Sequence, residues 1–111
     1  MTKPTMYRQG DVLLVRISDE TDAPTRGAAL VKRDKGRIIL AYGEVTGHSH
    51  AITDTWAKLF DLMNGERELV LPKESTLSHE EHGVLVIEPG TYRVTIQREY
   101  VPNELPRNVL D

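Results

Sequence analysis

The sequence contains no cysteine, which excludes both a disulfide framework and a zinc site built from thiolates. Any metal ion bound by this chain must therefore be held by nitrogen and oxygen atoms. Aromatic residues are also few, with a single Trp and a single Phe, so we expect a core of Val, Ile and Leu. No eighteen apolar residues run together, and the first residues lack the apolar core of a signal peptide. These absences predict a soluble, cytoplasmic protein with no membrane partner.

Neither sign of charge dominates the chain, and the formal net charge of −3 at pH 7 argues against nucleic acid as a partner. The length of 111 residues is enough for one domain with a real core and too short for two. We therefore expect a single domain over residues 1–111. A loose tail is expected at 1–6, and Pro102 and Pro106 predict an extended tail at 101–111.

Short segments rich in branched aliphatic residues recur along the chain, and glycine or proline turns separate them. The segments that we expect to be strands are 11–17, 37–42, 68–71, 84–88 and 91–100. The segment 56–63 is compatible with a strand or a short helix, and the Asn64-Gly65 turn after it favours a hairpin. This pattern predicts an all-β fold with little helix, arranged as a small single-domain β-barrel or sandwich.

Two regions of the expected sheet carry further predictions. Residues 30–33 and 37–42 flank a turn at 34–36 and predict a hairpin. The basic side chains around this turn are either solvated or form a patch for an anionic partner. They are Arg26, Lys32, Arg33, Lys35 and Arg37. The strand at 91–100 is a candidate edge strand, through which a homodimer or a larger homo-oligomer could form.

All four histidines fall into two close pairs, His48 with His50 and His79 with His82. Residues two apart on an extended segment point to the same side, so His48 and His50 should reach into one space. His79 and His82 are three apart, which brings their side chains together in a helical turn or a tight loop. Imidazole is the commonest protein ligand of zinc and related metals, so the two pairs predict a metal site with three or four histidine ligands. The alternative is a set of hydrogen-bonded or pH-sensitive histidines without a metal ion.

Acidic and hydroxyl residues near these pairs are candidates for proton transfer or for orienting the ligands. They are Glu44, Thr46, Ser49, Glu80 and Glu81. We take Glu44, Thr46 and Glu81 as the catalytic candidates, and Glu80 and Glu81 also add negative charge that favours a bound cation. Asp54, four residues beyond His50, is either a carboxylate ligand or a turn residue.

The number of ligands decides the chemistry expected of the site. Three protein ligands would leave a position for a water molecule, whose pKa zinc lowers to about 7. The leading prediction is therefore an enzyme that uses Zn²⁺, or another divalent transition metal, to direct a metal-bound hydroxide at a small-molecule substrate. The scarcity of aromatic residues leaves little material for a large apolar pocket and favours a small substrate. A site closed by four histidines would be structural, and the chain would then be a non-enzymatic interaction module.

Four motifs resemble those of an uncharacterised group of small bacterial and phage-borne proteins. They are Tyr7-Arg-Gln-Gly-Asp-Val-Leu-Leu14, Gly43-Glu-Val-Thr-Gly-His-Ser-His50, His79-Glu-Glu-His82, and Pro89-Gly-Thr-Tyr-Arg-Val94 with Gln97-Arg-Glu-Tyr100. The resemblance covers nearly the whole chain. It implies no established activity, but it suggests an association with a phage or a mobile element.

A second resemblance is to cupins, which are small metal-binding β-barrels. Gly43, His48, His50 and Asp54 approximate their first motif, and Gly83 and Pro89 match the spacing of their second. The acid is Asp here rather than Glu, and the second histidine pair precedes the second motif, so the resemblance implies a barrel more than a ligand set. Three histidines with a water molecule also resemble the site of carbonic anhydrases. Hydration of carbon dioxide, a lyase reaction, is thus the most concrete activity expected, and hydrolysis of a small ester or amide is the broader one.

A weaker likeness is to co-chaperonin barrels. It rests on the strand at 11–17, the polar loop after it and the strand at 37–41. These features imply only a small β-barrel, and they include none of the histidines.

Overall fold

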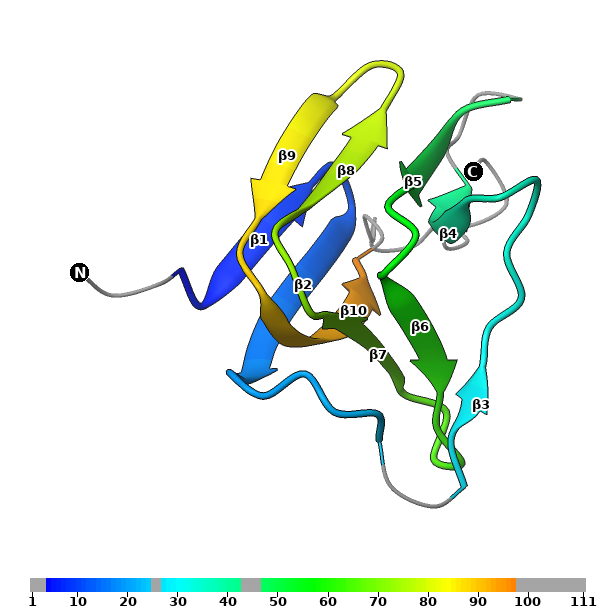
Figure 1. The fold of residues 1–111 in the computed structure, drawn as a ribbon. Helices are drawn as coiled ribbons and strands as arrows, with labels where there is room; N and C mark the ends of the chain where they lie inside the picture. Colours follow the sequence, from blue (N-terminus) through cyan, green and yellow to red (C-terminus); the bar gives the residue numbers. More distant parts are fainter. Residues whose placement is uncertain (1–3, 25–26, 43–46, 98–111) are drawn as a thin grey trace, which may run out of the picture.

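The structure is a computed structural model that describes residues 4–24, 27–42 and 47–97 (Figure 1). Across these residues the chain forms ten strands, and no helix that could cross a membrane is found. The strands are β1 (Met6–Gln9), β2 (Val12–Ser18), β3 (Ala29–Leu30), β4 (Ile38–Tyr42), β5 (Ser49–Ile52), β6 (Lys58–Asp61), β7 (Arg67–Leu71), β8 (Ser75–His79), β9 (Gly83–Ile87) and β10 (Gly90–Ile96). They form a six-stranded sheet in the order β1-β2-β10-β7-β6-β3 and a four-stranded sheet in the order β4-β5-β8-β9.

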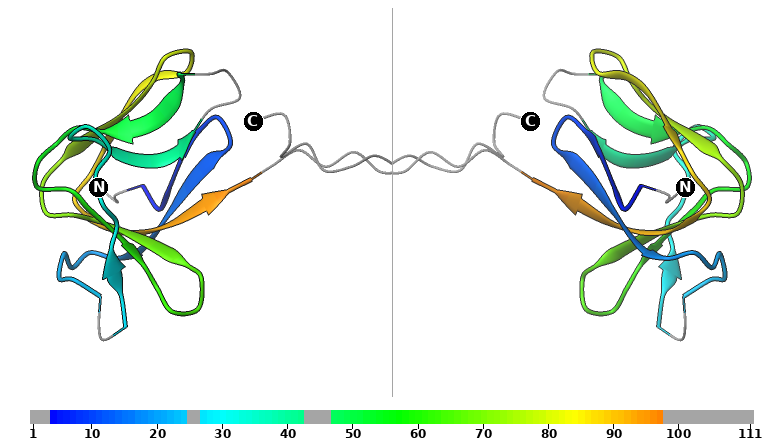
Figure 2. Two further views of the ribbon diagram at one scale, coloured as in Figure 1. Left: turned by 90° about the vertical axis from the view of Figure 1, so that its right-hand side faces the viewer. Right: turned by 90° about the vertical axis from the view of Figure 1, so that its left-hand side faces the viewer.

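The predicted all-β fold is confirmed, and of the two architectures the sandwich fits. Each sheet is open, because its first and last strands do not pair with each other. Figure 2 shows β4 and β5 on one side of the molecule and β10 on the other. The barrel is therefore not closed.

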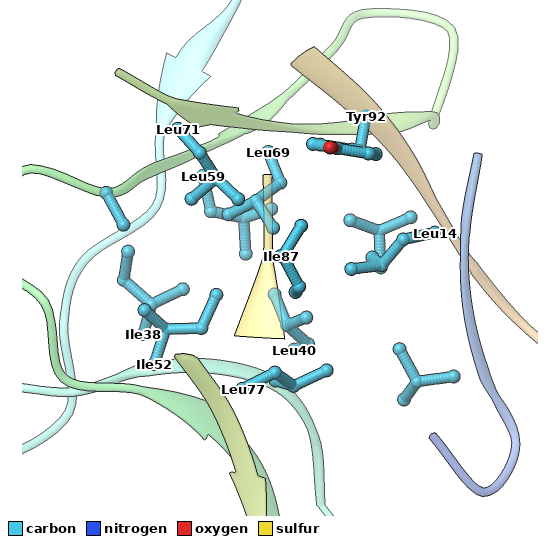
Figure 3. Close-up of a cluster of buried hydrophobic side chains, with 13 residues drawn as sticks. Leu14, Ile38, Leu40, Ile52, Leu59, Leu69, Leu71, Leu77, Ile87 and Tyr92 are labelled. Carbon is cyan, nitrogen blue, oxygen red and sulfur yellow. The ribbon is translucent and has the colours of Figure 1, made fainter. Parts of the chain in front are cut away.

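A single core joins the two sheets (Figure 3). Leu14 and Tyr92 enter it from neighbouring strands of the six-stranded sheet, whereas Leu40, Leu77 and Ile87 enter it from the four-stranded sheet. All five side chains are almost fully buried. The inward residues of β2 and β10 are two apart, as the alternation of a strand requires. The expected core of Val, Ile and Leu is confirmed, with Tyr92 as an aromatic addition.

β10 is an interior strand, which corrects the prediction that 91–100 lies at a sheet edge. It pairs with β2 from Thr91 to Ile96 and with β7 from Gly90 to Arg93. The backbone from Thr91 to Arg93 therefore has a neighbouring strand on both sides. The sequence shows that this segment is a strand, but its position within a sheet depends on pairing with distant segments. Residues 98–100 of the expected strand lie outside the described residues.

The turn at 34–36 is present, but the hairpin expected around it is wrong. β3 pairs with β6, whereas β4 pairs with β5 in the other sheet. A single bridge between Asp34 and Arg37 closes the turn. The guanidinium of Arg33 donates to three backbone carbonyl groups and so holds this segment where the chain crosses between the sheets. β3 and β4, on either side of this turn, therefore belong to different sheets and do not pair with each other.

The Asn64-Gly65 turn does join two paired strands, β6 and β7, so the segment 56–63 supplies a strand rather than a helix. At the N-terminal side, β1 begins at Met6, the last residue of the expected tail, and pairs with β2. Residues 1–3 and 101–111 lie outside the described residues.

Candidate metal centre

Strand pairing brings the two histidine pairs together. β5 and β8 run antiparallel, with Ala51 opposite Ser78. Continuing this register by one residue places His50 opposite His79, and the centres of the two rings are 4.3 Å apart. Only 2% of His50 and 9% of His79 is exposed, so both rings lie inside the protein.

His79 is the member of the cluster that contacts the other three rings. Its ring centre is 4.7 Å from that of His82 and 5.7 Å from that of His48. The turn between β8 and β9 places His79 beside His82, which is the tight loop that their spacing required. Imidazoles bound to one zinc ion have ring centres about 5 Å apart, because each zinc–nitrogen bond is about 2 Å long. The ring spacings around His79 are thus close to those of a shared ion.

A buried glutamine fixes the tautomer of His50. Nε2 of Gln9 donates to the backbone carbonyl groups of Leu77 and Gly83, both at 3.0 Å. These two bonds identify Oε1 of Gln9 as the acceptor, and it lies 2.8 Å from Nδ1 of His50. Nδ1 of His50 therefore carries the proton, and Nε2 keeps a lone pair for a proton or a metal ion.

Burial keeps His50 neutral at pH 7. Loss of water around the ring, together with the neighbouring His79, lowers the pKa of His50 from 6.5 to about 4. Asp11 opposes this shift of the pKa, since its Oδ1 lies 3.5 Å from Nε2 of His50, but it does not outweigh burial. The neutral imidazole is the form that binds a metal ion.

His79 is held in the opposite tautomer. Its Nδ1 accepts hydrogen bonds from the backbone N–H groups of Glu81 at 3.0 Å and His82 at 3.2 Å. A nitrogen that accepts carries no proton, so the proton of neutral His79 sits on Nε2. A metal ion can bind Nε2 of His79 only when this proton moves to Nδ1, which breaks both of these hydrogen bonds.

His48 carries an unsatisfied nitrogen beside two acidic residues. Among the described residues, its Nδ1 is the one buried side-chain polar atom without a hydrogen-bond partner. Oε1 of Glu81 is 3.0 Å away, but the two groups are not aligned for a hydrogen bond. The neighbouring Glu80 accepts a hydrogen bond from the backbone N–H of Ser49 at 3.0 Å, and this bond lowers the pKa of the Glu80 carboxyl. A buried nitrogen without a partner is rare and fits a site for a cation.

The donor atoms that could share one ion belong to His48, His79 and Glu80. One donor atom from each lies within 4.8 Å of the other two. Two imidazole nitrogens and a carboxylate oxygen are a donor set suited to zinc and other divalent transition metals. Donor atoms around a tetrahedral zinc ion lie about 3.3 Å apart, so loading this site needs side-chain movements of about an ångström.

The other expected site residues divide between described and undescribed parts of the chain. Glu44 and Thr46 lie outside the described residues. Glu81 lies in the turn after β8, with its carboxylate beside His48. Ser49 is buried at the start of β5, and its Oγ accepts a hydrogen bond from Arg37 at 3.3 Å.

Asp54 acts as a turn residue, which is one of the two alternatives open from the sequence. Its Oδ2 accepts a hydrogen bond from the backbone N–H of Thr76 at 2.9 Å. The carboxylate therefore ties the turn after β5 to β8. The acid of the cupin-like first motif is engaged in this contact.

The sequence patterns missed the turn between β1 and β2 as part of the site. Gln9 orients His50, and a side chain at Gly10 would approach Nε2 of His82 to 2.7 Å. Gly10 also has a φ of +59°, which favours glycine. The sequence feature that could have indicated this turn is the polar segment Gln9-Gly10-Asp11, which joins two strands. Nothing local links this turn to His50, which lies 41 residues further along the chain.

The fold and the cluster together define a small antiparallel β-sandwich with a candidate metal centre. The chain belongs to a family described as a domain of unknown function (DUF8820), whose model matches residues 8–97. The matched span includes Gln9 and all four histidines, and it agrees with the resemblance to an uncharacterised group. Comparisons with curated proteins and with solved structures found no match, so the resemblance to cupins is not confirmed.

Proposed function

We propose that this protein binds a divalent transition metal ion, zinc in the first instance, through the histidine cluster and uses it to activate water against a small electrophile. The observation that supports this most is the packing of all four imidazoles into one cluster that also holds the unsatisfied Nδ1 of His48. Zinc lowers the pKa of a bound water molecule to about 7 and so supplies hydroxide at neutral pH. Hydration of carbon dioxide is the most concrete reaction, and hydrolysis of a small ester or amide is the broader one.

The side chains have distinct roles in this proposal. His48, His79 and Glu80 each supply a donor atom, and these three atoms lie within 4.8 Å of one another. His50 adds a neutral Nε2, which the hydrogen bond to Gln9 leaves free of a proton. Binding at Nε2 of His79 requires the proton there to move to Nδ1, so the backbone N–H groups of Glu81 and His82 must give up that acceptor.

Metal content tests the first part of the proposal. After loading with zinc and desalting, we expect about one equivalent of zinc per wild-type chain by mass spectrometry, since the cluster has donors for one ion. His50→Ala and Glu80→Gln should retain less. Glu74→Gln is the matched control for Glu80→Gln, because Glu74 is exposed outside the cluster. Wild-type protein that retains no zinc would contradict the proposal.

Activity is tested next by stopped-flow measurement of carbon dioxide hydration and by hydrolysis of 4-nitrophenyl acetate. The zinc-loaded protein should be active, and removal of zinc with a chelator should abolish the activity. Zinc-loaded protein without either activity would contradict the enzymatic part while leaving metal binding intact.

A structural metal site is the second candidate, and the positions of the histidines favour it. The cluster joins β5, the turn after β8 and, through Gln9 and Gly10, the turn after β1. An ion there would hold three separate parts of the chain together. An inactive zinc-loaded protein that unfolds on chelation would support this candidate, and the chain would then serve as an interaction module for a phage or a mobile element.

A further inference from the structure

A groove of about 580 Å³ opens where the edges of the two sheets meet. β3 is an edge strand of the six-stranded sheet and β4 is an edge strand of the four-stranded sheet. The segment 31–37 crosses from one to the other beside the groove (Figure 1). None of the residues that line the groove belongs to the histidine cluster.

The groove reaches the core of the protein. Its apolar lining consists of Leu30, Val31, Ile38, Ala57 and Leu59. Ile38, Ala57 and Leu59 are at most 2% exposed, whereas Leu30 is 61% exposed. An aliphatic chain lying in the groove would contact this buried floor and would cover Leu30.

The rim of the groove is positively charged. Among the residues that the structure describes, Lys32, Arg33 and Lys58 line it and no acidic residue does. Lys32 and Lys58 take part in none of the ion pairs formed among the described residues. The guanidinium of Arg33 donates to three backbone carbonyl groups, which hold its charge in place, and it forms none of those ion pairs either. Lys32 and Arg33 belong to the basic cluster noted in the sequence.

We propose that this groove binds a small amphiphilic anion, namely an aliphatic carboxylate of medium chain length. The tail lies over Ile38 and Leu59, and the carboxylate lies at Lys32 and Lys58. An apolar floor with a few charged groups at the rim is the usual composition of a small-molecule site, and the volume is within the range of about 300–1,000 Å³ found for such sites. Charge complementarity selects an anion over a neutral or cationic amphiphile.

Titration of the full chain with sodium octanoate, followed by methyl NMR, tests this proposal. We expect saturable shifts of the Ile38, Ala57 and Leu59 methyl signals. Octanol, which lacks the charge, and acetate, which lacks the tail, should produce weaker shifts at the same concentrations. Saturable shifts that are equal for octanoate and octanol, or no saturable shift with octanoate, would overturn the proposal.

Charge reversal at the rim separates this site from general binding to a basic surface. The double variant Lys32→Glu, Lys58→Glu should weaken octanoate binding by about tenfold or more, because two attractive charges become repulsive. Lys35→Glu is the matched control, since Lys35 is exposed in the adjacent turn and does not line the groove; it should leave the affinity unchanged.

A second variant tests the apolar half without changing any charge. Leu30→Asn should weaken octanoate binding by several-fold, because the tail loses an apolar contact. Leu30 is mostly exposed, so this variant keeps the core intact and remains informative if the double variant does not fold. The NMR spectrum without ligand checks the fold of each variant. Octanoate affinity unchanged by Leu30→Asn, or unchanged in a folded double variant, would refute the site.

Discussion

His50 and His79 have rings in contact but are held in opposite tautomers, and this difference decides what each can do. Gln9 places the proton of His50 on Nδ1, whereas two backbone N–H groups keep Nδ1 of His79 free of a proton. Neutral His50 therefore offers an acceptor at Nε2, whereas neutral His79 offers a donor at Nε2. Gln9 is a positioning residue for the cluster, acting only through His50.

Replacing Gln9 by Leu should disturb both the fold and the tautomer of His50. The change removes the acceptor for Nδ1–H of His50 and the donor to the carbonyl groups of Leu77 and Gly83. Buried polar groups would lose their partners, so the free energy of unfolding should fall by about 1–3 kcal/mol in urea denaturation. Ring ¹⁵N chemical shifts of His50 should show both tautomers in place of one.

Gln9→Glu is the control for the tautomer, because a carboxylate keeps the acceptor for His50 while it loses the donor and adds a negative charge. We expect it to destabilise the protein while retaining the Nδ1–H tautomer of His50. A single Nδ1–H tautomer in Gln9→Leu as well would show that Gln9 does not position the ring.

The buried, neutral His50 should make the protein sensitive to acid. Its pKa is about 4 in the folded state, against an ordinary value of about 6.5 in the unfolded state. Between these pH values the unfolded state binds more protons, so the free energy of unfolding should fall as the pH decreases from about 6.5 to about 4. Above about pH 6.5, His50 adds no pH dependence to the free energy of unfolding.

Urea denaturation at a series of pH values measures this effect, and a variant isolates it. Asp11, His79, Glu80 and His82 also act on the pKa of His50 through their charges. The neighbouring groups are present in both wild type and His50→Asn. Subtracting the pH dependence of the free energy of unfolding of the variant from that of wild type therefore removes most of their contribution. Equal pH dependence in the two proteins would contradict the assignment.

The sequence indicated each histidine pair but not the contact between the pairs. Spacings of two and three residues set side-chain direction within one segment, so each pair could be inferred locally. The contact of His50 with His79 depends on the register of β5 against β8, and that of His50 with Gln9 depends on how β1 lies against the other sheet. Register and sheet packing arise from the whole chain.

At the scale of elements, turn residues predicted a hairpin at two places, and only one of these turns joins strands that pair with each other. The Asn64-Gly65 turn joins β6 and β7, which are partners. The turn at 34–36 lies between β3 and β4, which belong to different sheets. The sequence of 91–100 likewise predicted a strand but could not show that β2 and β7 lie on either side of it. The local sequence pattern indicates which face of a strand is buried, whereas the position of that strand in its sheet depends on pairing with distant segments.

Tyr92 anchors the start of β10, and its hydroxyl should contribute measurably to stability. The hydroxyl accepts a hydrogen bond from Arg16 of β2 and donates one to the carbonyl of Glu88, both at 2.7 Å. Burial of the ring raises the pKa of Tyr92, so the hydroxyl stays protonated and able to donate. Tyr92→Phe should lower the free energy of unfolding by about 1–2 kcal/mol, since both partners lose a bond.

Tyr42→Phe provides the comparison for Tyr92→Phe. The Tyr42 hydroxyl donates to Asp34 at 2.8 Å, but Tyr42 is 61% exposed, so water can replace the lost bond. We expect a change within about 0.5 kcal/mol in the same urea denaturation. Equal losses in the two variants would mean that the hydrogen bonds of Tyr92 add nothing beyond those of a surface hydroxyl.

At the scale of the whole molecule, the two sheets depend on one core. Residues of β2, β6, β7 and β10 meet residues of β4, β5, β8 and β9 in a single buried cluster (Figure 3). A four-stranded sheet with one apolar face needs that face covered, and here the six-stranded sheet covers it. We therefore expect both sheets to unfold in one cooperative transition.

Truncation of a core residue from either sheet should therefore destabilise the whole protein. Leu77 of β8 and Leu69 of β7 are fully buried, and each change to Ala should lower the free energy of unfolding by about 2–5 kcal/mol. Val86→Ala is the control, since Val86 is 51% exposed on β9. Far-UV circular dichroism follows all the strands, whereas fluorescence of Trp56, whose Nε1 donates to Ser75 Oγ at 2.9 Å, follows the region beside the start of β8. The two signals should change at the same urea concentration in each variant, and separate midpoints in Leu77→Ala would show that the four-stranded sheet can unfold while the other remains folded.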